Sequence, residues 1–260
     1  MPEYSATKDH FVSIGSGGNQ MMAMHYHPSY ELYYLEAGSR RYFVGDKLFT
    51  VSAGEFVLIP PGVLHRTGGE YGTRTLVGFT YSYLASAFSQ EMLSKLLVCF
   101  EHVKLLPGEN QKETCKTLIR KLTVCEDDTA FALILGLLLQ ELSQCSYEEL
   151  SPDRNSAIVS FINRNYAEIT NINQIAEHFF ISKYHLCRVF REAMQISVVD
   201  YLNQIRIKNA CGFLEATDKS ISEISVRCGY NSSAYFSNTF KKITGRSPAQ
   251  YRKEQKRKNR

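Results

Sequence analysis

Residues 221–251, ISEISVRCGYNSSAYFSNTFKKITGRSPAQY, decide the fold of the second half of this 260-residue chain. The same order of apolar and small residues occurs earlier, in residues 172–201, INQIAEHFFISKYHLCRVFREAMQISVVDY. The offset between the two copies is 49 residues before the central turn and 50 after it. A period of this size indicates a duplicated structural unit. Each copy is typical of a helix, a tight turn and a second helix, which is the outline of a helix-turn-helix.

Helix starts in this half are marked by capping residues. Ser220 with Glu223, and likewise Ser247 with Gln250, match the capping-box pattern in which two side chains satisfy backbone amides reciprocally. Asn171 with Gln174 matches the same pattern. Together with the apolar periodicity, these signals predict seven helices, at 152–166, 172–179, 182–193, 198–215, 221–228, 232–243 and 248–256.

The second helix of each copy carries polar residues on the face away from its apolar core positions. We expect His185 and Arg188 to contact base edges, because arginine pairs well with guanine in the major groove. The alternative for any single residue is an ordinary solvated helix face. The candidate DNA-binding residues are Ser182, Lys183, Tyr184, His185, Arg188 and Arg191 in the first copy, and Asn231, Ser232, Ser233, Tyr235, Asn238 and Lys241 in the second.

The second copy closely resembles the signature of the AraC/XylS family of transcription regulators. The resemblance covers about residues 154–253 and departs from the family at Ser225, where an alanine is usual. It implies a sequence-specific regulator, not an enzyme, with double-stranded promoter DNA, a small-molecule effector, RNA polymerase and a second copy of the chain as partners. The matching residues are Ile221, Ile224, Gly229, Tyr230, Ser232, Tyr235, Phe236, Ser237, Phe240, Lys241, Lys242, Gly245, Ser247, Pro248, Tyr251 and Arg252.

Charge is divided unevenly along the chain. Residues 151–260 hold 18 Lys/Arg against 9 Asp/Glu, whereas residues 1–150 hold 12 against 17. A basic half joined to an acidic half indicates a polyanionic partner for the basic half alone. The seven cysteines form no C-x-x-C pair, which favours a reducing cytoplasm and gives no zinc signal. We expect no cofactor, no signal peptide and no membrane-spanning segment.

The first half changes character near residue 83. Residues 10–82 alternate apolar and polar residues between glycine- and proline-rich turns, which predicts a small β-barrel or sandwich. The segments 86–102, 110–125 and 128–147 are leucine-rich and helical in pattern. We therefore expect an α+β protein with an effector-binding barrel at 1–82, which the motifs described next make cupin-like by resemblance, a helical linker and dimerisation region at 83–150, and an all-α DNA-binding domain with two helix-turn-helix units at 151–260.

A histidine-rich pattern lies within the predicted barrel. His25, His27 and Glu31 are separated by even steps, so on a strand they share one face, and His65 follows a proline–glycine turn. These strings resemble the two motifs of the cupin superfamily, which implies that His25, His27, Glu31 and His65 could hold a metal ion. The alternative function is accordingly a metal-dependent cupin enzyme fused to a DNA-binding module.

We favour a polar lining for an organic effector over a metal site. Tyrosine and arginine on the same face suit a polyhydroxyl or carboxylate ligand, with sugars as the leading class. The candidate effector-binding residues are His25, His27, Glu31, Tyr33, Arg40, Tyr42 and His65.

The segment 131–142, FALILGLLLQEL, is apolar almost all round. One face can cover the barrel, and the opposite face then needs a second cover. We expect a homodimer, because two-fold symmetric proteins match duplicated DNA half-sites. The alternative is a buried helix within a compact linker.

Overall fold

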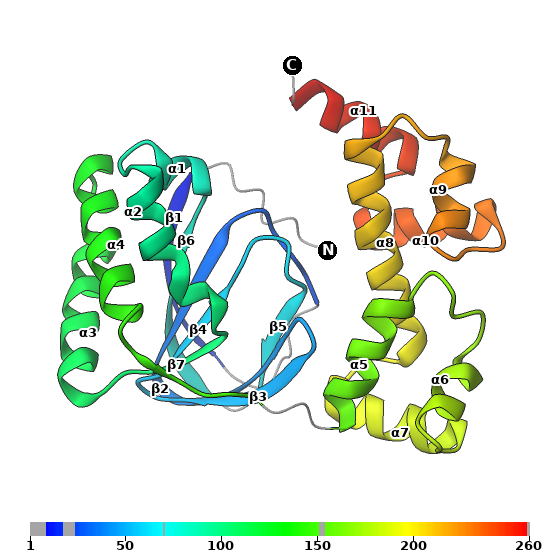
Figure 1. Cartoon of the computed structure of the whole chain (residues 1–260), viewed down its shortest axis with the longest axis horizontal. Helices are drawn as coiled ribbons and strands as arrows, with labels where there is room; N and C mark the ends of the chain where they lie inside the picture. Colours follow the sequence, from blue (N-terminus) through cyan, green and yellow to red (C-terminus); the bar gives the residue numbers. More distant parts are fainter. Residues whose placement is uncertain (1–8, 18–23, 70, 151–153, 259–260) are drawn as a thin grey trace. The chain divides into compact units, whose positions relative to one another are not determined.

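The computed structural model describes residues 9–17, 24–69, 71–150 and 154–258 (Figure 1). The chain divides into two compact units, with the division between residues 151 and 152. The first unit is an antiparallel sheet with helices against it, and the second is entirely helical, so the α+β expectation is confirmed. No helix among the described residues is long and apolar enough to cross a membrane.

The first unit is built around one long strand. β2 pairs through its first half with β4 and β6, and through its second half with β3 and β5. A register shift between Leu35 and Ala37 marks the bend between the halves. Together β1–β6 form what we call the barrel. Its strands are β1 (His10–Gly17), β2 (Tyr30–Val44), β3 (Lys47–Ser52), β4 (Phe56–Ile59), β5 (His65–Gly68) and β6 (Gly72–Phe79).

Side chains from the two halves of β2 meet inside the barrel. Tyr33, Tyr42, Phe49 and Val57 belong to one buried cluster, although they come from four different parts of the sheet. Alternate residues of β2 point the other way, where Leu32 and Tyr34 join a second cluster together with the helices. The two-residue period of a strand therefore separates an interior face from a helix-covered face.

The helices of the first unit pack on that second face of the sheet (Figure 1). The segment expected to be one helix at 86–102 is divided, and it is preceded by a short helix that the sequence did not predict. The elements are α1 (Tyr81–Ala85), α2 (Gln90–Leu97), η1 (Val98–Glu101), α3 (Glu109–Thr123) and α4 (Asp128–Leu142).

The predicted helix at 128–147 is too long. α4 ends at Leu142, and Ser146–Tyr147 form the strand β8, which pairs with β7 (Lys104–Leu106). β7 in turn pairs with β4, so the helical segment contributes two strands to the edge of the barrel sheet. Lys104 stabilises this edge through ion pairs with Glu55 and Glu148.

The second unit follows the predicted helices within about two residues at each end. The expected start of the first helix, at residue 152, lies outside the described residues. All three capping boxes are present, at Asn171, Ser220 and Ser247. The helices are α5 (Arg154–Asn165), α6 (Ile172–His178), α7 (Lys183–Met194), α8 (Val198–Ala216), α9 (Ile221–Arg227), α10 (Ser233–Thr244) and α11 (Pro248–Lys258).

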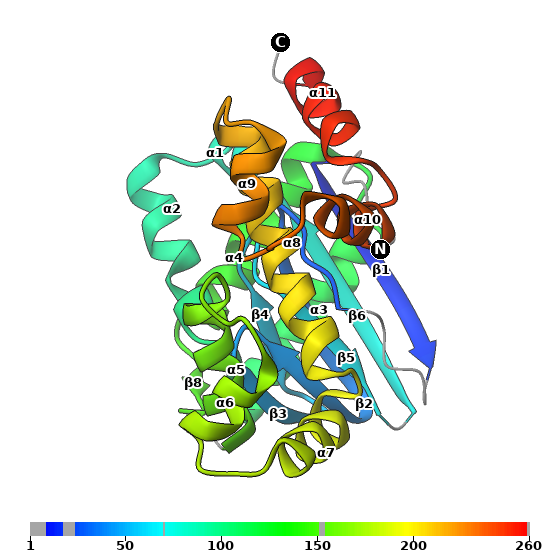
Figure 2. The same ribbon diagram turned by 90° about the vertical axis from the view of Figure 1, so that its right-hand side faces the viewer.

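The long helix α8 joins the two helix-turn-helix copies, α6–α7 and α9–α10 (Figure 2). Arg206 on α8 donates hydrogen bonds to the carbonyls of Tyr166 (2.9 Å) and Ile169 (2.5 Å) in the first copy's half of the unit. Its guanidinium lies 5.2 Å from the ring centroid of Tyr230, in the second copy. One side chain thereby contacts both halves.

Gly229 is required at the turn of the second copy for two reasons. Its φ of +80° lies in the left-handed region, which favours glycine. A Cβ at this position would lie 2.5 Å from the carbonyl oxygen of Ala167 and 2.8 Å from Nη2 of Arg206. The turn therefore packs directly against the first copy's half.

Replacing Gly229 tests this packing. We expect Gly229→Ala to lower the free energy of unfolding of the helical unit by about 2–3 kcal/mol, through positive-φ strain plus a backbone clash. Gly245→Ala is the matched control, because Gly245 has a φ of +78° but nothing within 4 Å of an added Cβ. It should cost only about 1 kcal/mol. The measurement is urea unfolding of the full-length protein, and equal losses for the two variants would contradict the contact.

Candidate functional site

The first recognition helix, α7, presents a polar outer face. Lys183, Tyr184 and Arg191 are exposed, whereas Leu186 and Phe190 are fully buried beneath them. The apolar side chains thus fix the orientation of the helix, and the predicted contact residues lie on the side facing solvent.

Two predicted contact residues of α7 already have partners within the protein. Ser182 is the N-cap, and its Oγ accepts a hydrogen bond from the backbone amide of His185 at 3.1 Å. The Arg188 guanidinium lies 3.1 Å from a Glu192 carboxylate oxygen and 3.2 Å from Nδ1 of His185. Both Arg188 and Glu192 are exposed, so the ion pair is weak enough for a DNA base or phosphate to replace it.

The second recognition helix, α10, has the same organisation. Ser232 is its N-cap, with Oγ accepting from the amide of Tyr235 at 3.3 Å. Tyr235 is half-exposed, and Asn203 of α8 donates a hydrogen bond to its hydroxyl at 3.4 Å. The six predicted residues of this copy are all exposed: Asn231, Ser232, Ser233, Tyr235, Asn238 and Lys241.

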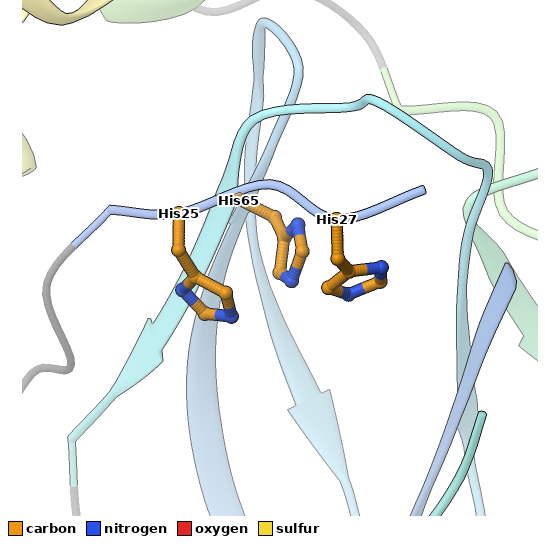
Figure 3. Close-up of side chains that lie close together, drawn as sticks. All are labelled: His25, His27 and His65. Carbon is orange, nitrogen blue, oxygen red and sulfur yellow. The ribbon is translucent and has the colours of Figure 1, made fainter. Parts of the chain in front are cut away.

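The predicted histidine cluster comes together at one end of the barrel. His25 and His65 form an isolated antiparallel bridge, with backbone hydrogen bonds of 2.9 and 3.0 Å. Figure 3 shows the rings of His25, His27 and His65 gathered on the same side of the backbone. Their ligand nitrogens all lie within 4.8 Å of one another. Glu31 lies against the cluster, with a carboxylate oxygen 3.0 Å from Nε2 of His27.

Charge within this cluster is set by Glu31. Burial alone would lower the pKa of His27, but its hydrogen bond and charge interaction with Glu31 raise that pKa above the ordinary value. Burial likewise opposes ionisation of Glu31, yet the hydrogen bond with His27 and the nearby imidazoles hold its pKa below the ordinary range. His27 and Glu31 therefore form a buried pair in which each side chain favours the charged form of the other.

The protonation state of His65 differs from that of His27. Burial lowers the pKa of His65 to about 4, so its imidazole is neutral near pH 7. Nδ1 donates to the carbonyl of Val63 at 2.8 Å, which leaves the lone pair on Nε2. That nitrogen is buried and has no hydrogen-bond partner among the described residues.

The cluster has the chemistry of a transition-metal site. A neutral imidazole fixed through Nδ1 to a backbone carbonyl is a common arrangement for a metal ligand. His25, His27, His65 and Glu31 would supply three nitrogens and one carboxylate, which suits a divalent transition metal. The residues present therefore fit such an ion.

The other predicted lining residues point into the barrel. Tyr33 and Tyr42 are buried, with ring centroids 4.8 Å apart in an edge-on contact. Arg40 is buried on the same face, because it pairs with Val51 across β2 and β3, and Val51 belongs to the interior cluster. Thr67 lies near both tyrosine hydroxyls.

Arg74 is a further interior residue that the sequence analysis missed. It pairs with Leu35 of β2 and Gly15 of β1, and its guanidinium lies 6.0 Å from the centroid of the Tyr33 ring. In the sequence it stands between two threonines, Thr73 and Thr75, so no alternation of apolar and polar residues marks its side. Only its partner strands show that it points inward.

Two family models match the chain. The AraC-like ligand binding domain matches residues 11–151, and the helix-turn-helix domain matches residues 175–254. The first of these covers more than half of the chain and spans both the barrel and its helices.

The chain is also similar to individual proteins. The uncharacterised HTH-type transcriptional regulator YdiP of Escherichia coli K12 is 26% identical over 241 residues, covering 86% of this chain and 78% of its own length. The melibiose operon regulatory protein of the same strain is 31% identical over 135 residues, which are 46% of this chain and 45% of that protein. A solved structure of ToxT from Vibrio cholerae is 14% identical with a TM-score of 0.38, covering 94% of this chain and 98% of that chain.

Proposed function

The chain belongs to the AraC family of DNA-binding transcription regulators, and we propose that its barrel binds a small polar effector which controls promoter binding by the two helix-turn-helix units. The observation that carries this proposal is the pair of capped recognition helices, each with buried apolar residues beneath an exposed polar face. α8 has 19 residues and spans about 28 Å, close to the ~34 Å repeat of the major groove. We place this activity in the cytoplasm, where promoter DNA is accessible.

Base reading is assigned to α7 and α10. Arg188 is the strongest candidate, because its guanidinium can form a bidentate pair with guanine once it leaves Glu192. Asn238 and Ser233 are short polar readers on the second helix, and Lys241 is suited to a phosphate. The net positive charge of residues 151–260 supports binding to the DNA backbone.

A pair of substitutions separates DNA contact from helix stabilisation at Arg188. We expect Arg188→Ala to weaken binding to the cognate promoter by roughly 5- to 150-fold, equivalent to about 1–3 kcal/mol. Glu192→Ala removes the same ion pair but leaves the guanidinium available, so it should bind at least as tightly as the wild type. Fluorescence anisotropy with promoter DNA from the chain's own gene neighbourhood, at fixed salt, measures both. Equal weakening in the two variants would show that Arg188 acts only through the helix.

The effector site is the interior of the barrel together with the histidine cluster. Buried hydroxyls, imidazoles and guanidinium groups there suit a ligand that carries several polar groups. The melibiose operon regulatory protein is named for a sugar operon, which supports sugars and their derivatives as the first class to screen.

We also propose that the protein acts as a homodimer through α4. Leu133 and Leu137 are one helical turn apart, and 53% and 58% of their surfaces are exposed. The opposite side of α4 is fully buried, with Leu135, Leu138 and Leu139 in the core shared with the sheet. Two exposed leucines on the outer face of a helix whose other side is buried suit a second copy of that face.

Charge placed on this face tests the dimer. We expect the double substitution Leu133→Glu and Leu137→Glu to convert a dimer into a monomer, because like charges would meet across a two-fold interface. Met92→Glu, at another exposed apolar position on α2, is the control and should leave the mass unchanged. Light scattering coupled to size exclusion gives the mass. A wild-type monomer, or a dimer that survives the double substitution, would refute this interface.

A metal-dependent enzyme is the second candidate, and the lone pair of His65 Nε2 is the observation that favours it. His25, His27, His65 and Glu31 would hold the ion, which would supply Lewis acidity to a bound substrate.

Metal content decides between the two candidates. A regulator with an organic effector predicts well under one metal ion per chain in untagged protein, by elemental analysis. His65→Ala and the control His102→Ala should then not differ. One equivalent of metal that is lost only in His65→Ala would instead favour the metal-dependent enzyme.

A further inference from the structure

We propose that the effector carries an anionic group, a carboxylate or a phosphate, and that Arg74 and Arg40 bind this group inside the barrel. The inference rests on the proposed function, because it assigns a chemical class to the ligand of that same barrel. It goes further in making a negative charge, rather than hydroxyl groups alone, the feature that the interior recognises.

The guanidinium of Arg74 is held in place by its neighbours. An added Cβ at Gly15 would lie 3.2–3.4 Å from three guanidinium atoms of Arg74, so glycine at this position leaves the space that the group occupies. On its other side lies the ring of Tyr33, 6.0 Å from ring centroid to guanidinium carbon. Arg74 thus lies between the backbone of one strand and an aromatic ring of another.

Despite this placement, Arg74 has no acidic partner within the part of the chain that the structure describes. No hydrogen bond or ion pair of its side chain occurs among the described residues, and Nη1 is fully buried without an acceptor. A desolvated guanidinium nitrogen without an acceptor costs free energy, which is why buried charges in proteins are normally paired. An anionic ligand would supply the missing acceptor, and its oxygens match the planar fork of arginine.

Arg40 lies beside Arg74 on the same face. An added Cβ at Gly72 would lie 3.4 Å from Cδ of Arg40, and Gly72 is two residues from Arg74 on β6. Gly72 and Arg74 therefore face the barrel interior together, as residues two apart on one strand do. Arg40 is 7% exposed, so this residue is largely removed from water.

The interior face of the described strands holds a carboxylate that already has a partner. Glu31 is the acidic side chain that the described strands place on the interior face, and it is engaged by His27 at 3.0 Å. Glu31 therefore does not supply the acceptor that Nη1 of Arg74 lacks among the described residues, and a ligand with a negative charge would supply one.

A structural role for Arg74 would predict different behaviour. Its contact with Tyr33 is at the long end of the cation–π range and contributes about 0.5–1 kcal/mol at most sites. Were that contact the reason for the arginine, its removal would destabilise the ligand-free protein. Were the arginine kept for an anion, an apolar residue of similar length would leave stability unchanged or increase it.

The first measurement is the melting temperature of full-length, ligand-free Arg74→Met. We expect it to equal or exceed the wild-type value, by up to about 2–4 °C. Arg41→Met is the matched control, because Arg41 neighbours Arg40 on β2 but is exposed. It should leave the melting temperature unchanged. A lower melting temperature in Arg74→Met alone would make the arginine structural and overturn the proposal.

The second measurement adds probes to the same three proteins at constant ionic strength. Inorganic phosphate, glucuronate and glucose 6-phosphate provide the anions, and glucose is the neutral partner of the last two. We expect at least one anion to raise the melting temperature of the wild type and of Arg41→Met, but not of Arg74→Met. Glucuronate alone would identify a carboxylate, whereas glucose 6-phosphate together with inorganic phosphate would identify a phosphate.

Two results would contradict an anionic effector without contradicting the proposed function as a transcription regulator. One is stabilisation by glucose equal to that by its charged derivatives, in the wild type and in Arg74→Met alike. The other is no difference between the wild type and Arg74→Met with any of the three anions. The promoter-binding assay with Arg188→Ala is independent of both, so failure of the proposed function would be seen there and not here.

Discussion

The contacts of Arg206 hold the two helix-turn-helix copies of the second unit in a fixed arrangement, on which binding to DNA depends. A double helix-turn-helix is useful only if its two recognition helices keep the spacing and orientation of successive major grooves. Arg206 fastens α8 to the backbone after α5 through two hydrogen bonds and meets Tyr230 of the second copy. Gly229 lets the turn of that copy approach the Ala167 carbonyl. The two hydrogen bonds and the close approach of Gly229 all end on backbone carbonyl oxygens, so on that side of the contact the spacing does not depend on a flexible side chain.

The helical unit could be predicted almost completely from its sequence because its signals are local. A capping serine or asparagine, a glutamine or glutamate three residues later and an apolar face at helical spacing all lie within one or two turns. Ser182 and Ser232 illustrate the overlap of roles: both were expected at the start of recognition helices, and both are N-caps there. The contacts of Arg206 could not be predicted, since its partners lie about 40 residues away in sequence.

The barrel was predicted in outline but not in its edges or in its full lining. β7 and β8 are three and two residues long and pair with each other across some 40 residues of helix, so no periodic pattern marks them. His25, His27 and Glu31 were placed together because their spacing is even, and the structure does bring them together with His65. Arg74 shows the limit of that reasoning. Its inward direction follows from its register with Leu35 and Gly15, which only the paired strands reveal.

The lack of an acceptor at Arg74 also bears on how an effector could control DNA binding. A ligand shifts a protein between two arrangements only by the difference between its affinities for them. A guanidinium held between Gly15 and Tyr33 without an acceptor carries an unfavourable free energy that pairing with an anion would relieve. If the barrel strands hold Arg74 in reach of the ligand in one arrangement only, that relief becomes the difference in affinity. The missing acceptor of Nη1, which is costly in the free protein, would then be the source of the effector's control over the promoter-binding unit.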